Sequence, residues 1–436
     1  MGPIVESSDF NVIFFFKAAK RNLSIFANMD RFQGIIGIIV ILGIAFLFSN
    51  NKKKINYRLV FSGIGLQVLI AILVLKVQPV TWFFQQVGKV MSKIEGFAKE
   101  GAGFVYGGIM VDTPSGVSNY AQNGFVFAFS VTATIILVCL LVEIFYYFGV
   151  MQRLVSIIAK AMRVVMRVSG AEALSNVASA FVGQVEAQVM IRPYLSSMTK
   201  SEILASMSGS LACIAGGILI VYANMGAKAE YLLTASLMAA PGALVISKIV
   251  FPETEESSTM GTVKLDVKSH HTNIIDAITH GASIGMKIAI NVIAMLIGFI
   301  ALMALINYLL GFMWDGLTLD VIFSKLFYPM AWVMGVPYED LGSTAALLGQ
   351  KLTINEFLAF KNMTTGVLPL VSEKGLLITS IAICGFANFS SVGMQIGGIG
   401  ELAPDRRKDL ATLGMKALLC GTLASYLSAT LAGIIA

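Results

Sequence analysis

The chain has 436 residues, of which 56% are hydrophobic and 13% charged. A soluble domain carries about 25% charged residues, so this composition excludes an ordinary soluble protein and indicates a polytopic membrane protein. The formal net charge is +6, but the basic residues form short clusters such as Lys52–Lys54 and Arg406–Lys408. Such clusters are typical of cytoplasmic loops, and no pattern indicates a nucleic-acid partner.

Residues 1–29 do not fit a membrane span. The apolar run Ile13–Phe16 is followed by Lys17, Lys20 and Arg21, whereas a signal peptide places its charges before the apolar region. We therefore expect an interfacial helix or a disordered arm here.

Eight stretches without charge follow, and about 20 apolar residues suffice for a helix to cross the bilayer. We predict an all-α protein with eight transmembrane helices, the third beginning near Phe125 because the residues before it read as a loop. The stretches are 32–51, 59–75, 113–142, 203–227, 231–247, 288–314, 375–400 and 417–436.

Amphipathic pieces lie between these spans. Residues 83–98 and 151–168 place apolar residues at helical spacing with basic residues on the other faces, which predicts interfacial helices. A packed connecting helix is the alternative for such stripes. Residues 320–333 resemble them, and the polar stretch 252–273 is predicted to be a cytoplasmic linker.

Residues 171–200 and 338–374 are too charged for full spans and too apolar for loops. We predict two re-entrant helical hairpins, whose non-helical tips are tolerated only where they face protein or a water-filled cavity. The order of span, amphipathic piece, hairpin and two spans occurs twice, with an odd number of crossings between the hairpins. That arrangement is an inverted repeat, which is common in secondary transporters.

Each hairpin carries one glutamate, Glu186 beside Gln184 and Glu356 beside Asn355. A carboxylate at membrane depth is costly and persists mainly where it binds, pairs or relays something. A matched pair in two repeats is therefore typical of a transport site. The alternatives are that Gln184 and Glu186 cap their own backbone, and that Glu356 forms a structural pair with Lys351.

Two spans contain residues that weaken a helix. Gly385–Gly393 combines glycine, asparagine and paired serines, and Cys213–Gly217 contains two glycines. Broken helices expose carbonyl groups that coordinate cations, although tight helix packing is an alternative for both segments. The four cysteines lack close spacing and the histidines lie in or beside the polar linker, so no clustered catalytic or metal-binding set indicates an enzyme.

From about residue 30 to its end, the chain resembles the concentrative nucleoside transporter family. The resemblance implies the fold predicted above, a homotrimer, an elevator mechanism and a nucleoside substrate. The motifs that carry it are Gly183–Ala187, Arg192–Tyr194, Met198–Glu202, Ala239–Gly242, Phe251–Glu255, Asn355–Phe357 and Gly385–Ser391.

The resemblance also implies roles for individual residues. Gln184 and Glu186 would bind the nucleobase, with Ile218 against it, and Val185 stands where Thr or Ser is usual. Because of this departure, the resemblance does not indicate whether purine or pyrimidine nucleosides are preferred. The remaining substrate residues would be Glu356, Asn388 and Ser391 on the ribose hydroxyls, and Phe386 in the pocket lining.

A coupling-cation site would consist of the side chains of Ser179 and Cys213 and the carbonyls of Val182 and Ile214. The family usually has Asn and Ser at the first two positions, and sodium prefers oxygen to a thiol. Sodium is the family's default ion, and these departures make a proton the alternative.

The function implied is import of nucleosides across the inner membrane by cation-coupled symport, with a passive facilitator as a further alternative. The partners would be the nucleoside, the bilayer and two further copies of the chain. The expected division is residues 1–29 as an extension, 30–150 as scaffold, 151–252 as the first transport repeat, 253–337 as linker and scaffold, and 338–436 as the second transport repeat.

Overall fold

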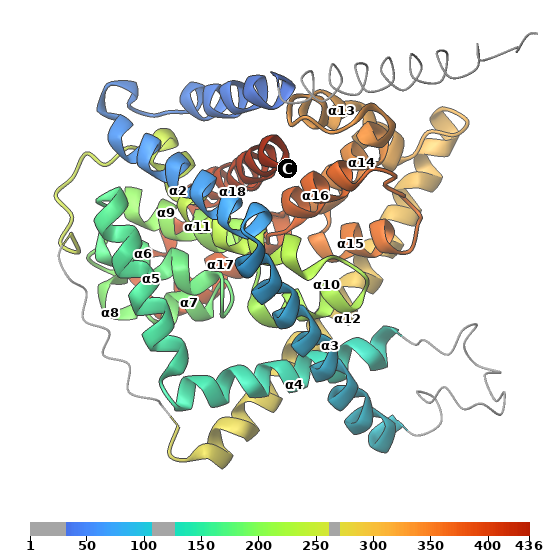
Figure 1. Ribbon diagram of the computed structural model, residues 1–436, viewed down its shortest axis with the longest axis horizontal. Coiled ribbons are helices and arrows are strands. Elements are labelled where there is room, and N and C mark those ends of the chain that lie inside the picture. Colours follow the sequence, from blue (N-terminus) through green and yellow to red (C-terminus); the bar gives the residue numbers. More distant parts are fainter. Residues whose placement is uncertain (1–31, 107–126, 261–270) are drawn as a thin grey trace, which may run out of the picture.

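The computed structural model describes residues 32–106, 127–260 and 271–436. Within these ranges the chain is helical and contains no strand, as predicted (Figure 1). The predictions for residues 1–29, for the loop before the third span and for residues 261–270 of the linker lie outside the described residues.

The first half of the chain contains mostly separate helices of very different length. An apolar helix at Phe32–Leu47 comes first. It is followed by η1 (Lys52–Lys54), α2 (Tyr57–Lys76), α3 (Gln78–Tyr106), α4 (Phe127–Tyr147), α5 (Val150–Met166), α6 (Gly170–Ser179), α7 (Glu186–Val189), α8 (Arg192–Leu195), α9 (Lys200–Ala212), α10 (Gly216–Asn224) and α11 (Ala229–Val250).

The second half repeats this alternation of long and short helices. Its elements are α12 (Ile274–Met313), α13 (Leu319–Val333), η3 (Tyr338–Asp340), α14 (Leu341–Thr353), α15 (Glu356–Thr364), α16 (Glu373–Ile383), α17 (Phe389–Leu402), η4 (Pro404–Arg406) and α18 (Arg407–Ile435).

Four of the described helices are long and apolar enough to cross a membrane, or five segments if α4 and α5, bent by 76°, count as one. The four lie at Tyr57–Lys76, Ala229–Val250, Ile274–Ala294 and Pro404–Ile435. The chain is therefore polytopic, while the total of eight spans and the re-entrant path of the hairpins stay predictions.

Several helices extend beyond the charge-free stretches that predicted them. The sixth predicted span, 288–314, is the end of α12, which begins at Ile274, and the eighth, 417–436, is the end of α18, which begins at Arg407. A helix begins at its cap and not at its last charge: Asn273 Oδ1 accepts a hydrogen bond from the Asp276 amide at 2.9 Å and starts α12.

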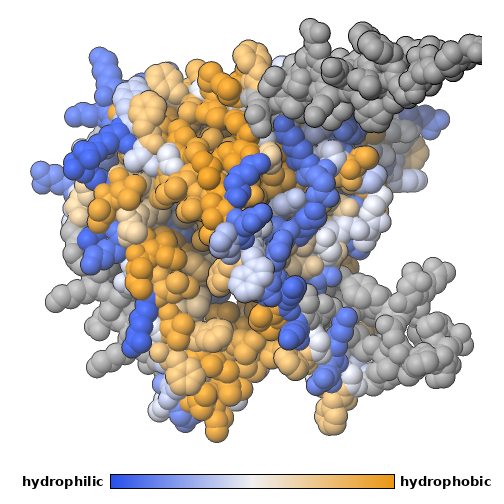
Figure 2. All heavy atoms as spheres, viewed as in Figure 1, coloured by the Kyte–Doolittle hydropathy of each residue, from blue (hydrophilic) through white to orange (hydrophobic). Residues whose placement is uncertain are grey.

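The helices α9, α11 and α18 lie side by side (Figure 1), and most of α11 and α18 is buried. Small residues allow this close approach: a Cβ on Gly421 of α18 would lie 2.8 Å from Leu211 Cβ of α9. Peripheral helices instead expose apolar side chains such as Phe61 and Ile297. Figure 2 shows the resulting apolar surface, which suits a lipid environment.

Two helices are broken where the sequence predicted weak points. The α9 helix ends at Ala212 before α10 begins at Gly216, and α16 ends at Ile383 before α17 begins at Phe389. The two breaks touch, because the Phe386 amide donates a hydrogen bond to the Cys213 carbonyl at 3.2 Å. Backbone groups that no helix satisfies are thus brought together inside the protein.

Candidate functional site

Glu356 is a buried carboxylate at the first position of α15. Its Oε1 accepts a hydrogen bond from the Tyr222 hydroxyl at 3.0 Å, and its Oε2 accepts one from Asn388 Nδ2 at 2.9 Å. An ionised carboxylate has further lone pairs for acceptance. The site therefore holds a pre-oriented acceptor beside α10 and α17.

Asn388 is the N-cap of α17, which fixes the direction of its side chain. Its Oδ1 accepts hydrogen bonds from the Ser391 amide at 2.8 Å and the Ser390 hydroxyl at 2.9 Å. The amide nitrogen consequently points to Glu356. The structure thus brings Glu356, Asn388 and Ser391 together; their binding of ribose stays a prediction.

Tyr222 was missed by the sequence analysis. It is fully buried and its ring stacks on Phe360, with centroids 4.5 Å apart. A tyrosine in the apolar run of α10 gives no sequence signal of a partner, because that partner lies 134 positions away. Only the tertiary structure pairs it with Glu356.

Lys351 does not form the direct ion pair with Glu356 that the structural alternative proposed. The Glu356 oxygens are engaged by Tyr222 and Asn388, and Lys351 Nζ is fully buried without a hydrogen-bond partner among the described residues. The α14 helix ends at Thr353, between the two residues.

The first hairpin bends at Gly183, where φ is +137°, a conformation that suits glycine. A Cβ there would lie 2.4 Å from Glu186 Oε2, so the Glu186 carboxylate folds back onto the tip. This geometry is compatible with the backbone-capping alternative. Residue Glu186 as a whole is nevertheless exposed, although its carboxylate is turned toward Gly183.

Gln184 lies on the buried side of the same tip and faces α17. Its Nε2 is 3.8 Å from Met394 Sδ, and its Oε1 has no hydrogen-bond partner among the described residues. A buried amide oxygen without a donor is costly. Gln184 therefore offers an acceptor that a ligand can satisfy.

The α17 helix connects the two groups of predicted residues. Met394, beside Gln184, lies six residues after Asn388, or about 9 Å along the helix axis. Val185 packs against Gly398, further along α17. Ile218 in α10 and Phe386 in the second break are half-buried.

The predicted cation residue Ser179 belongs to a polar network. Its hydroxyl donates to the Ser175 carbonyl at 2.7 Å and lies 2.8 Å from Ser210 Oγ, which accepts from Gln188 Nε2 at 2.8 Å. Since Ser179 uses its hydrogen on Ser175, Ser210 donates to Ser179. Ser179 keeps one lone pair for a cation, and Gln188 and Ser210 are network members that the sequence analysis missed.

The other predicted cation ligands differ in quality. No described residue donates a hydrogen bond to the carbonyls of Val182 or Ile214, so both oxygens are available to a cation. Cys213 Sγ lies 3.8 Å from the Asn176 carbonyl, a weak contact that leaves a soft ligand. The two carbonyl oxygens are therefore suitable cation ligands, whereas the Cys213 thiol is a poor ligand for sodium.

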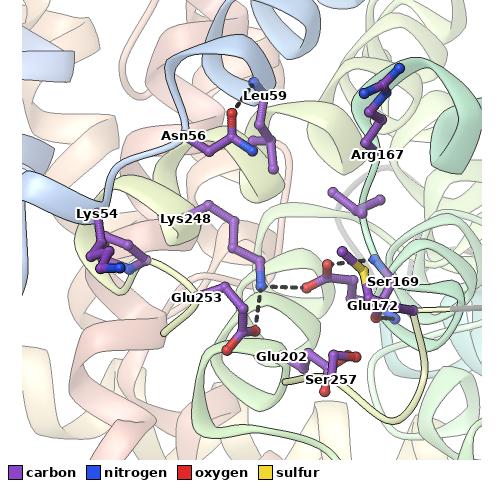
Figure 3. Close-up of a pocket in the computed structure, with 13 residues that line it drawn as sticks. Lys54, Asn56, Leu59, Arg167, Ser169, Glu172, Glu202, Lys248, Glu253 and Ser257 are labelled. Carbon is purple, nitrogen blue, oxygen red and sulfur yellow. Dashed lines mark hydrogen bonds and ion pairs between the residues drawn. The ribbon is translucent and has the colours of Figure 1, made fainter. Parts of the chain in front are cut away.

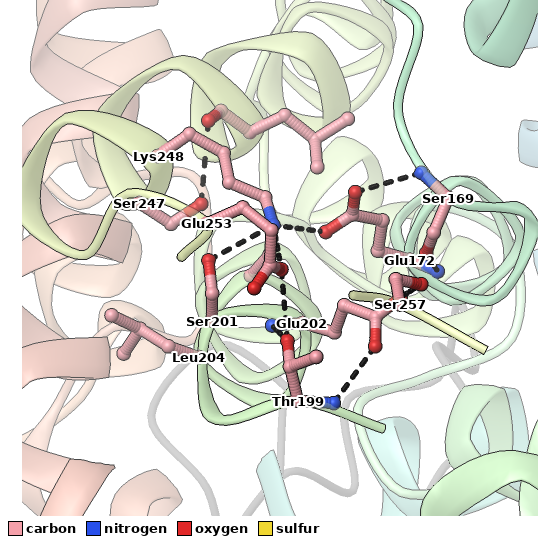
Figure 4. Close-up of polar contacts among 12 residues, drawn as sticks. Ser169, Glu172, Thr199, Ser201, Glu202, Leu204, Ser247, Lys248, Glu253 and Ser257 are labelled. Carbon is pink, nitrogen blue, oxygen red and sulfur yellow. Dashed lines mark hydrogen bonds and ion pairs between the residues drawn. The ribbon is translucent and has the colours of Figure 1, made fainter. Parts of the chain in front are cut away.

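A buried polar network lies apart from these residues, at the ends of α6, α9 and α11 (Figures 3 and 4). Lys248 forms ion pairs with Glu172 at 2.8 Å and Glu253 at 3.3 Å, and donates to Ser201 at 3.0 Å. It adjoins a cavity of about 190 Å³ that none of the predicted site residues lines. We interpret this network as a structural junction.

Residues Gly281–Gly285 have the spacing Gly-x-Ser-x-Gly, which in hydrolases marks a strained turn between strand and helix. Here the segment lies inside α12. Added Cβ atoms on Gly281 and Gly285 would each lie 2.6 Å from a backbone carbon of α4, at Leu140 and Ile136. The glycines therefore serve helix packing and give no support to an enzyme.

The fold and the site define a polytopic helical membrane transporter with buried polar residues beside two broken helices. Three family profiles match, described as the N-terminus of a Na⁺-dependent nucleoside transporter over residues 36–109, nucleoside recognition over residues 128–229, and the C-terminus of a Na⁺-dependent nucleoside transporter over residues 231–433.

Characterised relatives agree with these profiles. The nucleoside permease NupC of Helicobacter pylori is 37% identical over 92% of this chain and 96% of its own length. The sodium/nucleoside cotransporter 1 of Rattus norvegicus is 36% identical over 96% of this chain and 67% of its own length. The solved structure of CNTnw in an inward-facing substrate-bound state matches with a TM-score of 0.88 and 39% identity, covering 94% of this chain and 98% of CNTnw. The chain belongs to the concentrative nucleoside transporter family.

Proposed function

We propose that this protein imports nucleosides across the inner membrane by symport with a cation. The observation that carries the proposal is the buried array of Tyr222, Glu356 and Asn388. Ribose hydroxyls both donate and accept hydrogen bonds, so they match a carboxylate held beside an amide. Ser391 adds a hydroxyl at the same end of α17.

The nucleobase would lie toward the first hairpin. The unsatisfied Gln184 amide oxygen and the carboxylate of Glu186 are acceptors for ring and exocyclic N–H groups. Ile218 and Phe386 would supply apolar faces for the base. Val185, packed on Gly398, has no hydroxyl to offer, so selectivity would depend on Gln184 and Glu186.

The coupling ion would bind near the first hairpin and the first helix break. The unpaired carbonyls of Val182 and Ile214 and the lone pair of Ser179 support a cation there. Sodium is the ion named for the matching family. The Cys213 thiol and the saturated Ser179 donor favour the alternative, coupling to protons.

Transport would follow an elevator cycle in which residues 151–252 and 338–436 carry the site past a scaffold of residues 30–150 and 253–337. The similar transporter CNTnw has been solved in inward- and outward-facing states. We further propose that the protein works as a homotrimer.

Uptake of labelled uridine and adenosine into proteoliposomes tests this function, with sodium and proton gradients imposed separately. We expect one gradient to drive accumulation above equilibrium and the other to be without effect. Uptake that only reaches equilibrium would establish a facilitator, and no uptake of either nucleoside under either gradient would refute nucleoside transport.

A further inference from the structure

Three metal-ligating side chains converge where α4 meets the beginning of α12. Glu143 Oε2 lies 2.8 Å from His271 Nε2, and Glu143 Oε1 lies 3.8 Å from His280 Nδ1. One ligand atom from each residue lies within 4.8 Å of the other two. This cluster is separate from the nucleoside site and has no role in the proposed function.

The packing of α12 on α4 brings these residues together. A Cβ on Gly281 would lie 3.1 Å from Glu143 Cγ, so the neighbouring His280 is held against the end of α4. His271 precedes the cap of α12 and is only 10% exposed, whereas His280 is 54% exposed. Figure 1 shows the beginning of α12 beside the end of α4 that bends into α5. The cluster is thus anchored on one side and open to solvent on the other.

The donor set and its spacing suit a borderline metal ion. Zinc binds imidazole nitrogen and carboxylate oxygen at about 2.0–2.2 Å in tetrahedral geometry, which separates two ligand atoms by about 3.3 Å. The separations of 2.8 Å to His271 and 3.8 Å to His280 start from different Glu143 oxygens and bracket that value. With one ligand atom taken from each residue, the three atoms lie within 4.8 Å of one another, so the side chains must draw closer to hold a single ion. Calcium and magnesium prefer sites made only of oxygen.

A carboxylate also stands behind one of the histidines. Asp276 Oδ2 lies 3.8 Å from His271 Nδ1 and is itself fixed by the Thr272 amide at 2.9 Å. Metal-binding histidines commonly orient their second nitrogen toward such a carboxylate, which fixes the tautomer and raises ligand basicity. His271 therefore presents Nε2 to the cluster.

We propose that Glu143, His271 and His280 bind one divalent transition-metal ion of the zinc type, with water at the fourth position. The bound ion joins the end of the linker and the first turns of α12 to α4. The alternative, which needs no metal, is a hydrogen-bonded cap formed by Glu143 and His271.

The test uses the full-length protein in detergent. Zinc affinity is measured by competition with a chromogenic chelator, and coordination by the visible absorption of the Co²⁺ form. We expect one ion per chain and an affinity at least about 100-fold lower in His271→Ala and Glu143→Gln. Asp276→Asn should weaken binding about 10- to 100-fold, whereas Glu401→Gln, an exposed carboxylate elsewhere, should leave the affinity unchanged.

Folding is checked independently by the melting temperature without metal. Zinc should raise that temperature in the unmodified protein and not in the ligand variants, because binding stabilises only the folded state. Full affinity in both His271→Ala and His280→Ala, or no bound ion in the unmodified protein, would overturn the proposal. So would loss of binding in His270→Ala together with full binding in His280→Ala.

Discussion

The candidate site depends on single polar side chains in apolar surroundings, and these side chains differ in how fully they are hydrogen-bonded. Glu356 has both carboxylate oxygens engaged by donors from other helices, which makes its charge tolerable at depth. Gln184 has an amide oxygen with no described partner. The Glu356 carboxylate is thus satisfied within the protein, whereas the Gln184 amide oxygen lacks a donor among the described residues.

Replacing Glu356 with Gln should nearly abolish uptake. The amide has one oxygen where the carboxylate has two, so its NH₂ replaces one of the acceptors that face Tyr222 and Asn388, and the negative charge is lost. Loss of a charged hydrogen bond costs about 1.5–3 kcal/mol, or about 10- to 150-fold in nucleoside affinity. Binding is measured by titration with uridine. The matched substitution Glu401→Gln should bind normally, and normal binding by Glu356→Gln would contradict the assigned role.

Tyr222→Phe should weaken nucleoside binding while the fold is retained. The change removes the hydroxyl that donates to Glu356 and keeps the ring that stacks on Phe360. Leaving the carboxylate short of a donor costs about 1–3 kcal/mol. Tyr426→Phe is the control, because the buried Tyr426 hydroxyl has no described partner and its loss should be neutral or stabilising. Equal effects of both changes on binding would exclude a specific role for Tyr222.

At the scale of elements, the contact between the two helix breaks organises the site. The second break adopts φ of +133° at Gly385, and a Cβ there would lie 2.4 Å from the Ala212 carbonyl oxygen. The next amide, of Phe386, bonds to the Cys213 carbonyl. Glycine is therefore required for both its backbone conformation and its lack of a side chain.

Gly385→Ala should impair both folding and transport. The strained conformation alone costs about 1–3 kcal/mol, and the clash with Ala212 would push the breaks apart. Melting temperature and uptake are the measurements. Gly393→Ala in α17, where an added Cβ meets nothing within 4 Å, should instead stabilise by up to about 1 kcal/mol. If Gly385→Ala behaved like Gly393→Ala, the close contact of the breaks would be wrong.

At the scale of the whole molecule, buried charge joins segments that are distant in sequence. Lys248 of α11 compensates Glu172 at the beginning of α6 and Glu253 after α11. Glu202 at the beginning of α9 accepts from Ser257 and Thr259. This network connects the beginnings of α6 and α9 to the end of α11.

Lys248→Met should destabilise the protein by about 3–5 kcal/mol, because it leaves buried carboxylates without their counter-charge. The control is Lys228→Met. Lys228 pairs with Glu373 at the surface, where the side chains are 37% and 75% exposed, and such a pair contributes about 0–1 kcal/mol. Thermal unfolding in detergent compares the two. A similar melting temperature for both variants would show that the Lys248 network is not structural.

The exposed pair also has a predictable pH range. Its hydrogen bond raises the pKa of Lys228 above 10.5 and lowers that of Glu373 below 4.5. The small stabilisation is therefore present between these values. It is lost as pH falls through the folded pKa of Glu373 or rises through that of Lys228. The difference in melting temperature between the unmodified protein and Lys228→Met should shrink as pH falls below 4.5 and vanish below the folded pKa of Glu373. A constant difference would contradict the pairing.

The amino-acid sequence by itself determined the helical membrane class, both helix breaks and the candidate residues, because apolar length and local backbone preference are properties of short segments. The sequence-based prediction bounded each span at a charged residue and so started the sixth span at residue 288. In the structure the same helix, α12, begins earlier, at Ile274 after its cap Asn273. Only the tertiary structure decided that Tyr222 serves Glu356, that Ser179 is tied to Ser210, and that Glu143 meets two histidines. Such partners lie far apart along the chain, and which of them meet is fixed by the packing of helices against one another.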